Sequence, residues 1–185
     1  MKTKDIVNIA MLTTLLCVCA WIYIPMTIPF TMQTFAVFLA MFVLGGKKGL
    51  LVISTYLFLG MIGMPVFSGG TAGPGVVFGP TGGYMLGWIA IGLISWLGQV
   101  LAEPALKAGT GKQTWQQIVP AITGLFVCYT FGTLWYIFVY ADAAQQTGII
   151  AILSVCVFPY ILPDIIKLAL AYTVSKRIKK FIVNV

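Results

Sequence analysis

Long apolar runs, separated by short clusters of charged residues, glycine or proline, limit what this sequence can fold into. Of its 185 residues, 60% are hydrophobic and only 8% are charged, and a helix needs roughly 20 apolar residues to cross a bilayer. The pattern predicts an all-α integral membrane protein with six transmembrane helices, in a single transmembrane domain over residues 1–185. The six runs are about Ile6–Ile24, Met32–Leu44, Leu50–Met64, Tyr84–Ala102, Ile118–Tyr140 and Pro159–Val174.

Two of these runs are shorter than a bilayer is thick. Met32–Leu44 and Leu50–Met64 fall below the roughly 20 residues that an untilted helix needs to cross the hydrocarbon core. We expect these two helices either to extend into their flanking residues or to be sheltered from lipid by neighbouring helices.

Basic residues follow alternate runs, and this alternation predicts the orientation, because cytoplasmic loops retain Lys and Arg. Both termini would be cytoplasmic in a multi-pass protein of the cell membrane. Three segments without Lys or Arg would face outward, namely Pro25–Thr31, Pro65–Gly83 and Ala141–Phe158. The basic residues are Lys2, Lys4, Lys47, Lys48, Lys107, Lys112, Lys176, Arg177, Lys179 and Lys180.

The composition argues against several classes of function. The net charge is +7, but it lies in short clusters and not along a face that could follow phosphates, so we expect no nucleic-acid binding. Histidine is absent and the four cysteines lack C-x-x-C spacing, so we expect no metal site and no cofactor. The sequence contains no G-x-x-x-x-G-K-[ST] motif for nucleotide hydrolysis. With a single carboxylate in the apolar runs, we predict that the chain has no catalytic residues and is not an enzyme.

Asp164 and Lys167 place two opposite charges in the otherwise apolar stretch FPYILPDIIKLALAYTV. An ionisable group at membrane depth usually faces a partner, a cavity or a ligand, because exposing it to lipid costs roughly 2.5–3.5 kcal/mol. Residues three apart share a helix face. Two roles remain open: a structural ion pair that holds helices in register, and a ligand-binding pair.

The prolines around Asp164 predict where its helix begins. Ile149–Phe158 is apolar but short, and Pro159 and Pro163 follow it. A helix running through both prolines would lose backbone hydrogen bonds. We therefore expect a separate interfacial or re-entrant helix at Ile149–Phe158, and a sixth span that begins near Pro163 with Asp164 in its first turn.

The outward segments contain uncharged residues suited to a small-molecule pocket. Pro65–Gly83 combines glycines, which permit tight turns and close approach to a ligand, with aromatic and aliphatic residues that favour burial. Pro25–Gln33 adds neutral hydrogen-bonding groups. Such pockets are mostly apolar with a few fixed polar groups. Our candidate ligand-binding residues are Thr31, Gln33, Phe67, Gly73, Phe78, Thr81, Tyr84, Tyr160, Asp164 and Lys167.

Three stretches of the sequence resemble the BioY family, the biotin-specific substrate-binding subunits of energy-coupling factor transporters. They are IPFTMQTFAVFLAMFVLGGKKG, YLFLGMIGMPVFSGGTAGPGVVFGPTGGYMLG and FPYILPDIIKLALA. The resemblance is specific, because the P-V-F-S-G-G loop, the G-P-T-G-G-Y turn and the P-D-x-x-K element occur together and in order. It covers essentially the whole chain.

The resemblance implies a high-affinity biotin-binding subunit that captures its vitamin from the extracellular side. The pocket would be closed by the loops after the first, third and fifth helices. It also implies three partners besides the bilayer: a transmembrane coupling subunit and two cytoplasmic ATPases. Docking of the coupling subunit in this family commonly uses an Ala-x-x-x-Ala face on the first helix. Here the nearest match is Ala10 with Thr14, so ordinary packing within the bundle remains an alternative.

Biotin also suits the residues on chemical grounds. Asp164 can accept a hydrogen bond from a ureido N–H, and Lys167 can donate to the ureido oxygen or balance the carboxylate of the tail. Two other functions stay open: a substrate-binding subunit for another vitamin, and a small-solute channel or solo transporter. Competition among biotin, riboflavin and thiamine distinguishes the first, and loss of uptake without ATP or partner proteins argues against the second.

Overall fold

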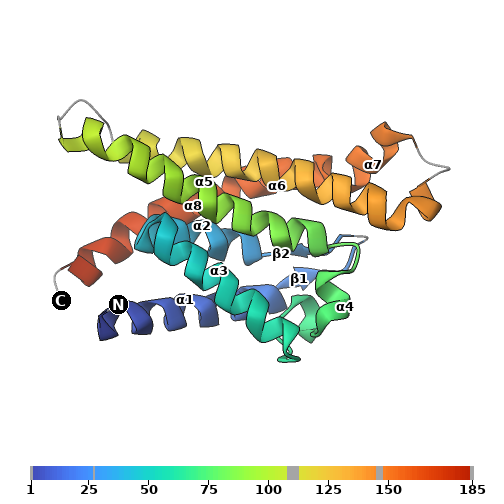
Figure 1. The fold of residues 1–185 in the computed structure, drawn as a ribbon, viewed down its shortest axis with the longest axis horizontal. Helices are drawn as coiled ribbons and strands as arrows, with labels where there is room; N and C mark the ends of the chain where they lie inside the picture. Colours follow the sequence, from blue (N-terminus) through green and yellow to red (C-terminus); the bar gives the residue numbers. More distant parts are fainter. Residues whose placement is uncertain (1, 27, 108–112, 145–147, 184–185) are drawn as a thin grey trace.

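Helices make up almost all of the computed structural model, which describes residues 2–26, 28–107, 113–144 and 148–183 (Figure 1). Lys112, one of the basic residues used above to predict orientation, lies outside this range. A short antiparallel ladder of β1 (Tyr23–Ile24) and β2 (Phe30–Thr31), which the sequence did not suggest, joins the first two helices. The helices are α1 (Thr3–Trp21), α2 (Gln33–Leu44), α3 (Gly46–Met61), the 3₁₀ turn η1 (Ser68–Gly70), α4 (Pro74–Val77), α5 (Gly82–Lys107), α6 (Gln113–Ala144), α7 (Ile149–Cys156) and α8 (Phe158–Val183).

The prediction of an all-α, multi-pass membrane protein is confirmed. Among the residues that the structure describes, four helical stretches are long and apolar enough to cross a bilayer, namely Thr3–Trp21, Gly82–Pro104, Thr114–Val139 and Ile149–Lys179. Exposed threonines on these helices donate their hydroxyl to the carbonyl four residues earlier, which satisfies the polar group within the helix and suits a side chain that faces lipid. They are Thr14, Thr123, Thr130 and Thr173.

The two short runs behave differently from the long ones. Helix α2 has only 12 residues, and every residue from Ala36 to Phe42 is buried. It is therefore sheltered by neighbouring helices, as one of the two expectations stated. Helix α3 begins at Gly46 and has 16 residues, so it extends N-terminally beyond the apolar run. Asp5 of α1 forms an ion pair with Lys48 of α3 and ties these helices together.

The predicted start of the last span is wrong. Helix α7 is separate, as expected, but α8 begins at Phe158 and continues through Pro163. Pro159 stands in the first turn, where a backbone N–H has no helical partner, and Pro163 removes only one further bond. Asp164 consequently lies in the second turn of α8, and its position does not rest on the helix N-terminus.

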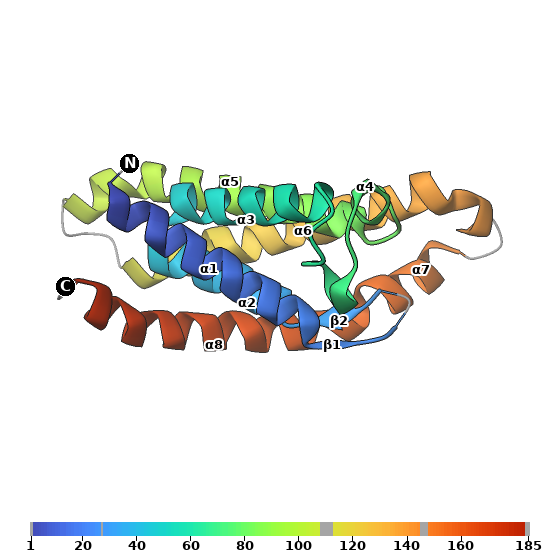
Figure 2. The same cartoon turned by 90° about the horizontal axis from the view of Figure 1, so that it is seen from below.

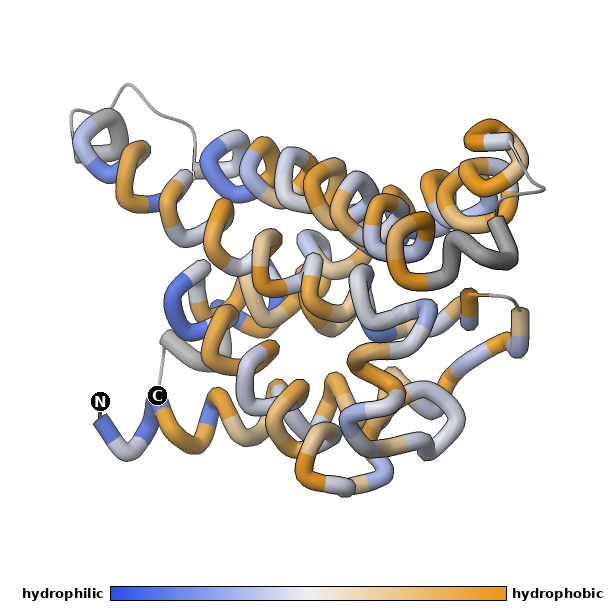
Figure 3. The backbone as a smooth tube through the Cα atoms, turned by 45° about the vertical axis from the view of Figure 1, so that its right-hand side comes forward, coloured by the Kyte–Doolittle hydropathy of each residue, from blue (hydrophilic) through white to orange (hydrophobic). Residues whose placement is uncertain are grey.

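The two ends of the bundle differ in character. Both chain termini and the α2–α3 junction lie at one end, whereas β1, β2, α4 and α7 lie at the other (Figures 1 and 2). Hydrophilic segments gather toward the end with the termini, and apolar segments extend along the helices (Figure 3). The segments that carry the basic clusters are thus brought to one end, and the loops predicted to form the pocket are brought to the other.

Glycine allows α3 and α5 to touch at their backbones. A Cβ on Gly46 would stand 2.2 Å from the backbone nitrogen of Trp96 in α5. We expect Gly46→Ala to lower the free energy of unfolding by about 1–3 kcal/mol, the usual effect of overpacking, because neither backbone can move aside without shifting a helix. Thermal unfolding in detergent measures the loss. Gly75→Ala is the control, since a Cβ there meets nothing within 4 Å, and equal stability of the two variants would contradict the prediction.

Candidate ligand-binding pocket

A pocket lies where the β1–β2 hairpin and the loop before α5 meet the helices α2, α4, α5, α6, α7 and α8. Its cavity volume, taken as the space open to the centres of water-sized spheres, is about 90 Å³, several times what a single water needs. Most of its wall is apolar or aromatic, with a few polar groups. The lining residues are Ile28, Pro29, Thr31, Gln33, Thr34, Phe67, Ser68, Val76, Thr81, Tyr84, Met85, Trp88, Leu125, Cys128, Tyr129, Cys156, Tyr160, Asp164 and Lys167.

The face of α8 that packs inward carries both charged residues. Buried positions recur along this helix at three- and four-residue steps, and the intervening residues, such as Ile165 and Ile166, are exposed. This helical period places Asp164 and Lys167 in the pocket wall and keeps them away from lipid. Their side chains are only 5% and 6% exposed.

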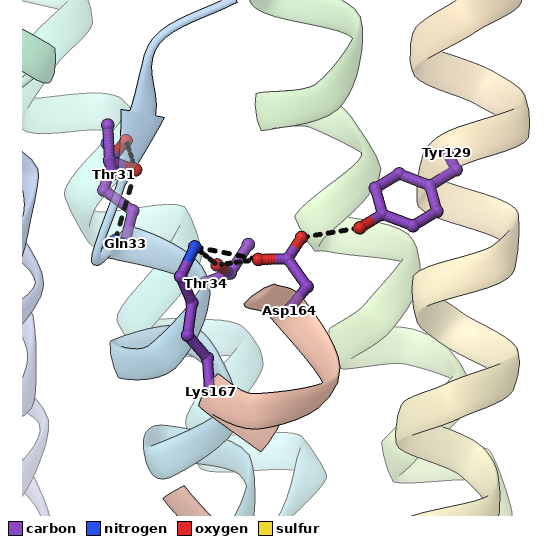
Figure 4. Close-up of polar contacts among 6 residues, drawn as sticks. All are labelled: Thr31, Gln33, Thr34, Tyr129, Asp164 and Lys167. Atoms are coloured by element: carbon purple, nitrogen blue, oxygen red, sulfur yellow. Dashed lines mark hydrogen bonds and ion pairs between the residues drawn. The ribbon is translucent and has the colours of Figure 1, made fainter. Parts of the chain in front are cut away.

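Asp164 is held by three donors from three helices (Figure 4). Its Oδ1 accepts hydrogen bonds from Lys167 Nζ at 2.8 Å and from Thr34 Oγ1 of α2 at 2.8 Å. Its Oδ2 accepts one from the Tyr129 hydroxyl of α6 at 2.7 Å. A carboxylate can accept about four hydrogen bonds, so Oδ2 retains one acceptor position for a further donor. The pair joins α2, α6 and α8 and also lines the pocket, so the geometry suits both roles that the sequence left open.

Lys167 links the charged pair to the hairpin over the pocket. Its Nζ donates to Thr34 Oγ1 at 3.1 Å and lies 4.1 Å from the centre of the Phe30 ring in β2. Phe30 stacks on Tyr160 with ring centres 6.5 Å apart. The Tyr160 hydroxyl donates to the carbonyl oxygen of Ile28. These contacts attach the segment between α1 and α2 to α8 and position it at the pocket.

A second polar cluster lies in the α2 wall of the same pocket (Figure 4). The Thr31 hydroxyl donates to Gln33 Oε1 at 2.7 Å and accepts from the Gln33 backbone N–H at 3.3 Å. Gln33 Nε2 donates to the hydroxyl of Tyr56 in α3 at 2.6 Å. Both Thr31 and Gln33 are buried, so their orientation is set within the protein.

Eight of the ten predicted ligand-binding residues line this pocket, and two do not. Phe78 lies outside the pocket and follows α4 directly, with its side chain 57% exposed. Gly73 also lies outside the pocket, at the start of α4, with φ +97° and its backbone N–H donated to the carbonyl oxygen of Gly60. Gly73 therefore shapes the loop and does not border the pocket. The eight are Thr31, Gln33, Phe67, Thr81, Tyr84, Tyr160, Asp164 and Lys167.

The pocket residues absent from the candidates include Thr34, Trp88 and Tyr129. Thr34 directly follows Gln33 on the first turn of a buried helix, and this position in the sequence could have indicated that Thr34 borders the pocket. Trp88 is four residues after Tyr84, a spacing that places both on one face of α5. Tyr129 lies in the middle of a long apolar helix, and no local pattern distinguishes it from a packing residue.

Comparison with known proteins identifies the family of the chain. The model of a family described as the BioY family matches residues 1–184. The chain belongs to the BioY family. Membership confirms the resemblance drawn from the loop and P-D-x-x-K motifs.

Curated BioY relatives match over nearly their full length. The "Biotin transporter BioY" of Thermotoga maritima is 35% identical over 179 residues, which cover 96% of this chain and 96% of the relative. "Biotin transporter BioY2" of Lactococcus lactis is 36% identical over 185 residues, and 97% of each protein is covered. Because the relatives are transporters, the prediction that this BioY-family chain is not an enzyme is confirmed.

A solved structure shares the fold of the BioY-family chain. It is described as the S-component for biotin from an ECF-type ABC transporter, and it superposes with a TM-score of 0.77 at 25% sequence identity. The alignment covers 97% of this chain and 95% of the other. The arrangement of long and short helices is therefore that of a transporter S-component.

Proposed function

We propose that this BioY-family chain is the high-affinity biotin-binding subunit of an energy-coupling factor transporter and that it captures biotin in the pocket described above. The observation that supports this most directly is the buried Asp164–Lys167 pair in the wall of a mostly apolar pocket. A channel would need charges along a conduction path, whereas these two charges bind one another on one helix.

The chemistry of biotin matches the groups that the pocket offers. Its ureido ring has two N–H donors and one carbonyl acceptor, its thiophane ring is apolar, and its tail ends in a carboxylate. Asp164 Oδ2 has one unused acceptor position for an N–H. Lys167 supplies a cation for a carbonyl or carboxylate oxygen. Phe67, Trp88 and Leu125 form an apolar wall that suits the thiophane ring.

The proposed orientation of the chain in the membrane is based on the basic clusters, which gather at one of its two ends. We propose six membrane-crossing helices, α1, α2, α3, α5, α6 and α8, with both termini in the cytoplasm of the cell. The end that holds the termini also holds the described basic segments, which matches the retention of Lys and Arg on the cytoplasmic side. In this proposed orientation the pocket, which the hairpin and the loop before α5 border, would open toward the extracellular side.

Translocation of biotin would require partners, a transmembrane coupling subunit and two cytoplasmic ATPases. The solved relative is described as a component of an ECF-type ABC transporter, which supports such an assembly. Ala10 and Thr14 are both exposed on α1. The Thr14 hydroxyl is bonded to the Ala10 carbonyl at 3.0 Å, so Thr14 can present its methyl group to a partner helix. We propose this face as the docking surface for the coupling subunit.

Calorimetric titration of biotin into the purified protein in detergent tests the proposal. We expect saturable binding that riboflavin and thiamine do not displace. Displacement of biotin by either of the other vitamins, or no heat from a folded and ligand-free protein, would contradict it.

A further inference from the structure

Tyr56 stands directly behind the pocket wall without bordering the pocket. Its side chain on α3 is completely buried. Its ring centre lies 5.5 Å from that of Phe67 and 6.3 Å from that of Trp88, and both of these residues line the pocket. Its hydroxyl is within 2.6 Å of Gln33 Nε2 and 3.0 Å of the backbone oxygen of Val66. Tyr56 therefore connects α2 to the loop that follows α3.

The Val66 carbonyl fixes the direction of the hydrogen bonds in this chain of groups. A carbonyl oxygen can only accept, and a tyrosine hydroxyl has one hydrogen to donate. Tyr56 gives that hydrogen to Val66, so its oxygen must accept from Gln33. The end of the Gln33 amide that faces Tyr56 is consequently the NH₂ group. The opposite end, Oε1, faces Thr31 and accepts from its hydroxyl at 2.7 Å.

The fixed amide presents its hydrogen-bond donor at one defined end. One of the two Nε2 hydrogens is used on Tyr56, and Oε1 already accepts one hydrogen bond from Thr31, so the amide keeps one free hydrogen on Nε2 and one lone pair on Oε1. Gln33 lines the pocket, and its remaining hydrogen is a donor. We propose that Tyr56 is a positioning residue that determines ligand specificity, because it fixes Gln33 as a hydrogen-bond donor and so selects a ligand that has an acceptor oxygen there.

This inference rests on the proposed function only for the identity of the ligand. Biotin has two acceptor groups, the ureido carbonyl and the tail carboxylate, and either can meet Gln33. Two analogues replace these groups one at a time: 2-iminobiotin has an imine in place of the ureido oxygen, and biotinol has an alcohol in place of the carboxylate.

Tyr56→Phe keeps the ring and removes the hydroxyl, so the Gln33 amide can turn either end toward the ligand. The test is to measure affinities of the wild type and the variant for biotin, 2-iminobiotin and biotinol. We expect the preference for biotin over one of the two analogues to fall by about tenfold. Tyr172→Phe is the matched control, because it removes a hydroxyl that donates to Thr114 and does not line the pocket. It should leave both preferences unchanged.

Gln33→Glu provides a second route to the same result if Tyr56→Phe does not fold. It keeps the shape of the side chain but replaces the donor by an acceptor, and it should reduce the same preference. Preferences equal to those of the wild type in the variants that fold would overturn the proposal. So would an equal loss of affinity for all three compounds, because that result indicates a structural role alone.

A measurement without ligand separates this inference from the proposed function. In protein labelled with ¹⁵N-glutamine, the Gln33 side-chain proton that binds Tyr56 should give a downfield-shifted resonance, assigned by its absence from Gln33→Glu. The resonance should move upfield in Tyr56→Phe. An unchanged resonance would overturn the proposed role of Tyr56 even if biotin binds. Wild-type protein that shows the expected shift but does not bind biotin would contradict the proposed function alone.

Discussion

Asp164→Asn should weaken biotin binding by about tenfold to 150-fold, the equivalent of one charge-assisted hydrogen bond of about 1.5–3 kcal/mol. The substitution preserves the size of the side chain but removes the negative charge and one acceptor atom. An amide nitrogen cannot accept the bonds that Asp164 now receives from Lys167, Thr34 or Tyr129. Titration calorimetry of the wild type and the variant in detergent measures the difference.

A second variant separates ligand binding from structural pairing. Asp164→Asn alone leaves the buried ammonium of Lys167 without its counter-charge, which can lower stability by about 3–5 kcal/mol. The double variant Asp164→Asn with Lys167→Met removes both charges and should recover much of the thermal stability. If the pair binds ligand, the double variant stays unable to bind tightly. If biotin affinity returns together with stability, the pair is a structural lock and the proposed role in binding is wrong.

Bulky side chains in place of the small residues Ala10 and Thr14 on α1 should strongly reduce biotin uptake while leaving the pocket intact. We expect the double variant Ala10→Trp with Thr14→Trp to lower biotin uptake by the assembled transporter about tenfold or more, because close helix packing in membranes depends on small residues. Affinity in detergent should stay at the wild-type value, since neither residue lines the pocket. Uptake into cells that express the coupling subunit and ATPases, measured beside calorimetry, distinguishes transport from binding.

Met11→Trp is the control for this experiment. Met11 is 65% exposed on the same helix but lies one residue, about 100°, around from Ala10. Its replacement should leave uptake close to the wild-type rate. Normal uptake by the Ala10 and Thr14 double variant would place the docking surface elsewhere on the protein.

Sequence patterns succeeded where the governing physics is local. The length and hydropathy of the apolar runs predicted membrane-crossing helices, because the thickness of the bilayer sets the length of an apolar helix. The three-residue spacing of Asp164 and Lys167 correctly predicted that they share a helix face. Loop composition located part of the pocket wall, since uncharged segments that combine aromatic residues with glycine favour ordered, buried loops.

Local rules failed where tertiary contacts outweighed them. Helix α8 continues through Pro163, because the packing of its inward face stabilises the helix more than one lost backbone bond destabilises it. Phe78 was expected to be buried in the pocket, but the turn at the end of α4 leaves it exposed. An apolar residue in a membrane protein can face lipid as readily as a pocket, so its hydrophobicity did not indicate which.

The sequence by itself determined that the chain is a helical membrane protein, which loops accompany the pocket and which two charges belong in it. The tertiary structure alone decided the partners of those charges. Thr34 and Asp164 are 130 positions apart, and Tyr129 and Asp164 are 35 apart. Their meeting depends on how α2, α6 and α8 pack together, and that packing arises from the shapes of many side chains at once, which no local spacing in the sequence encodes.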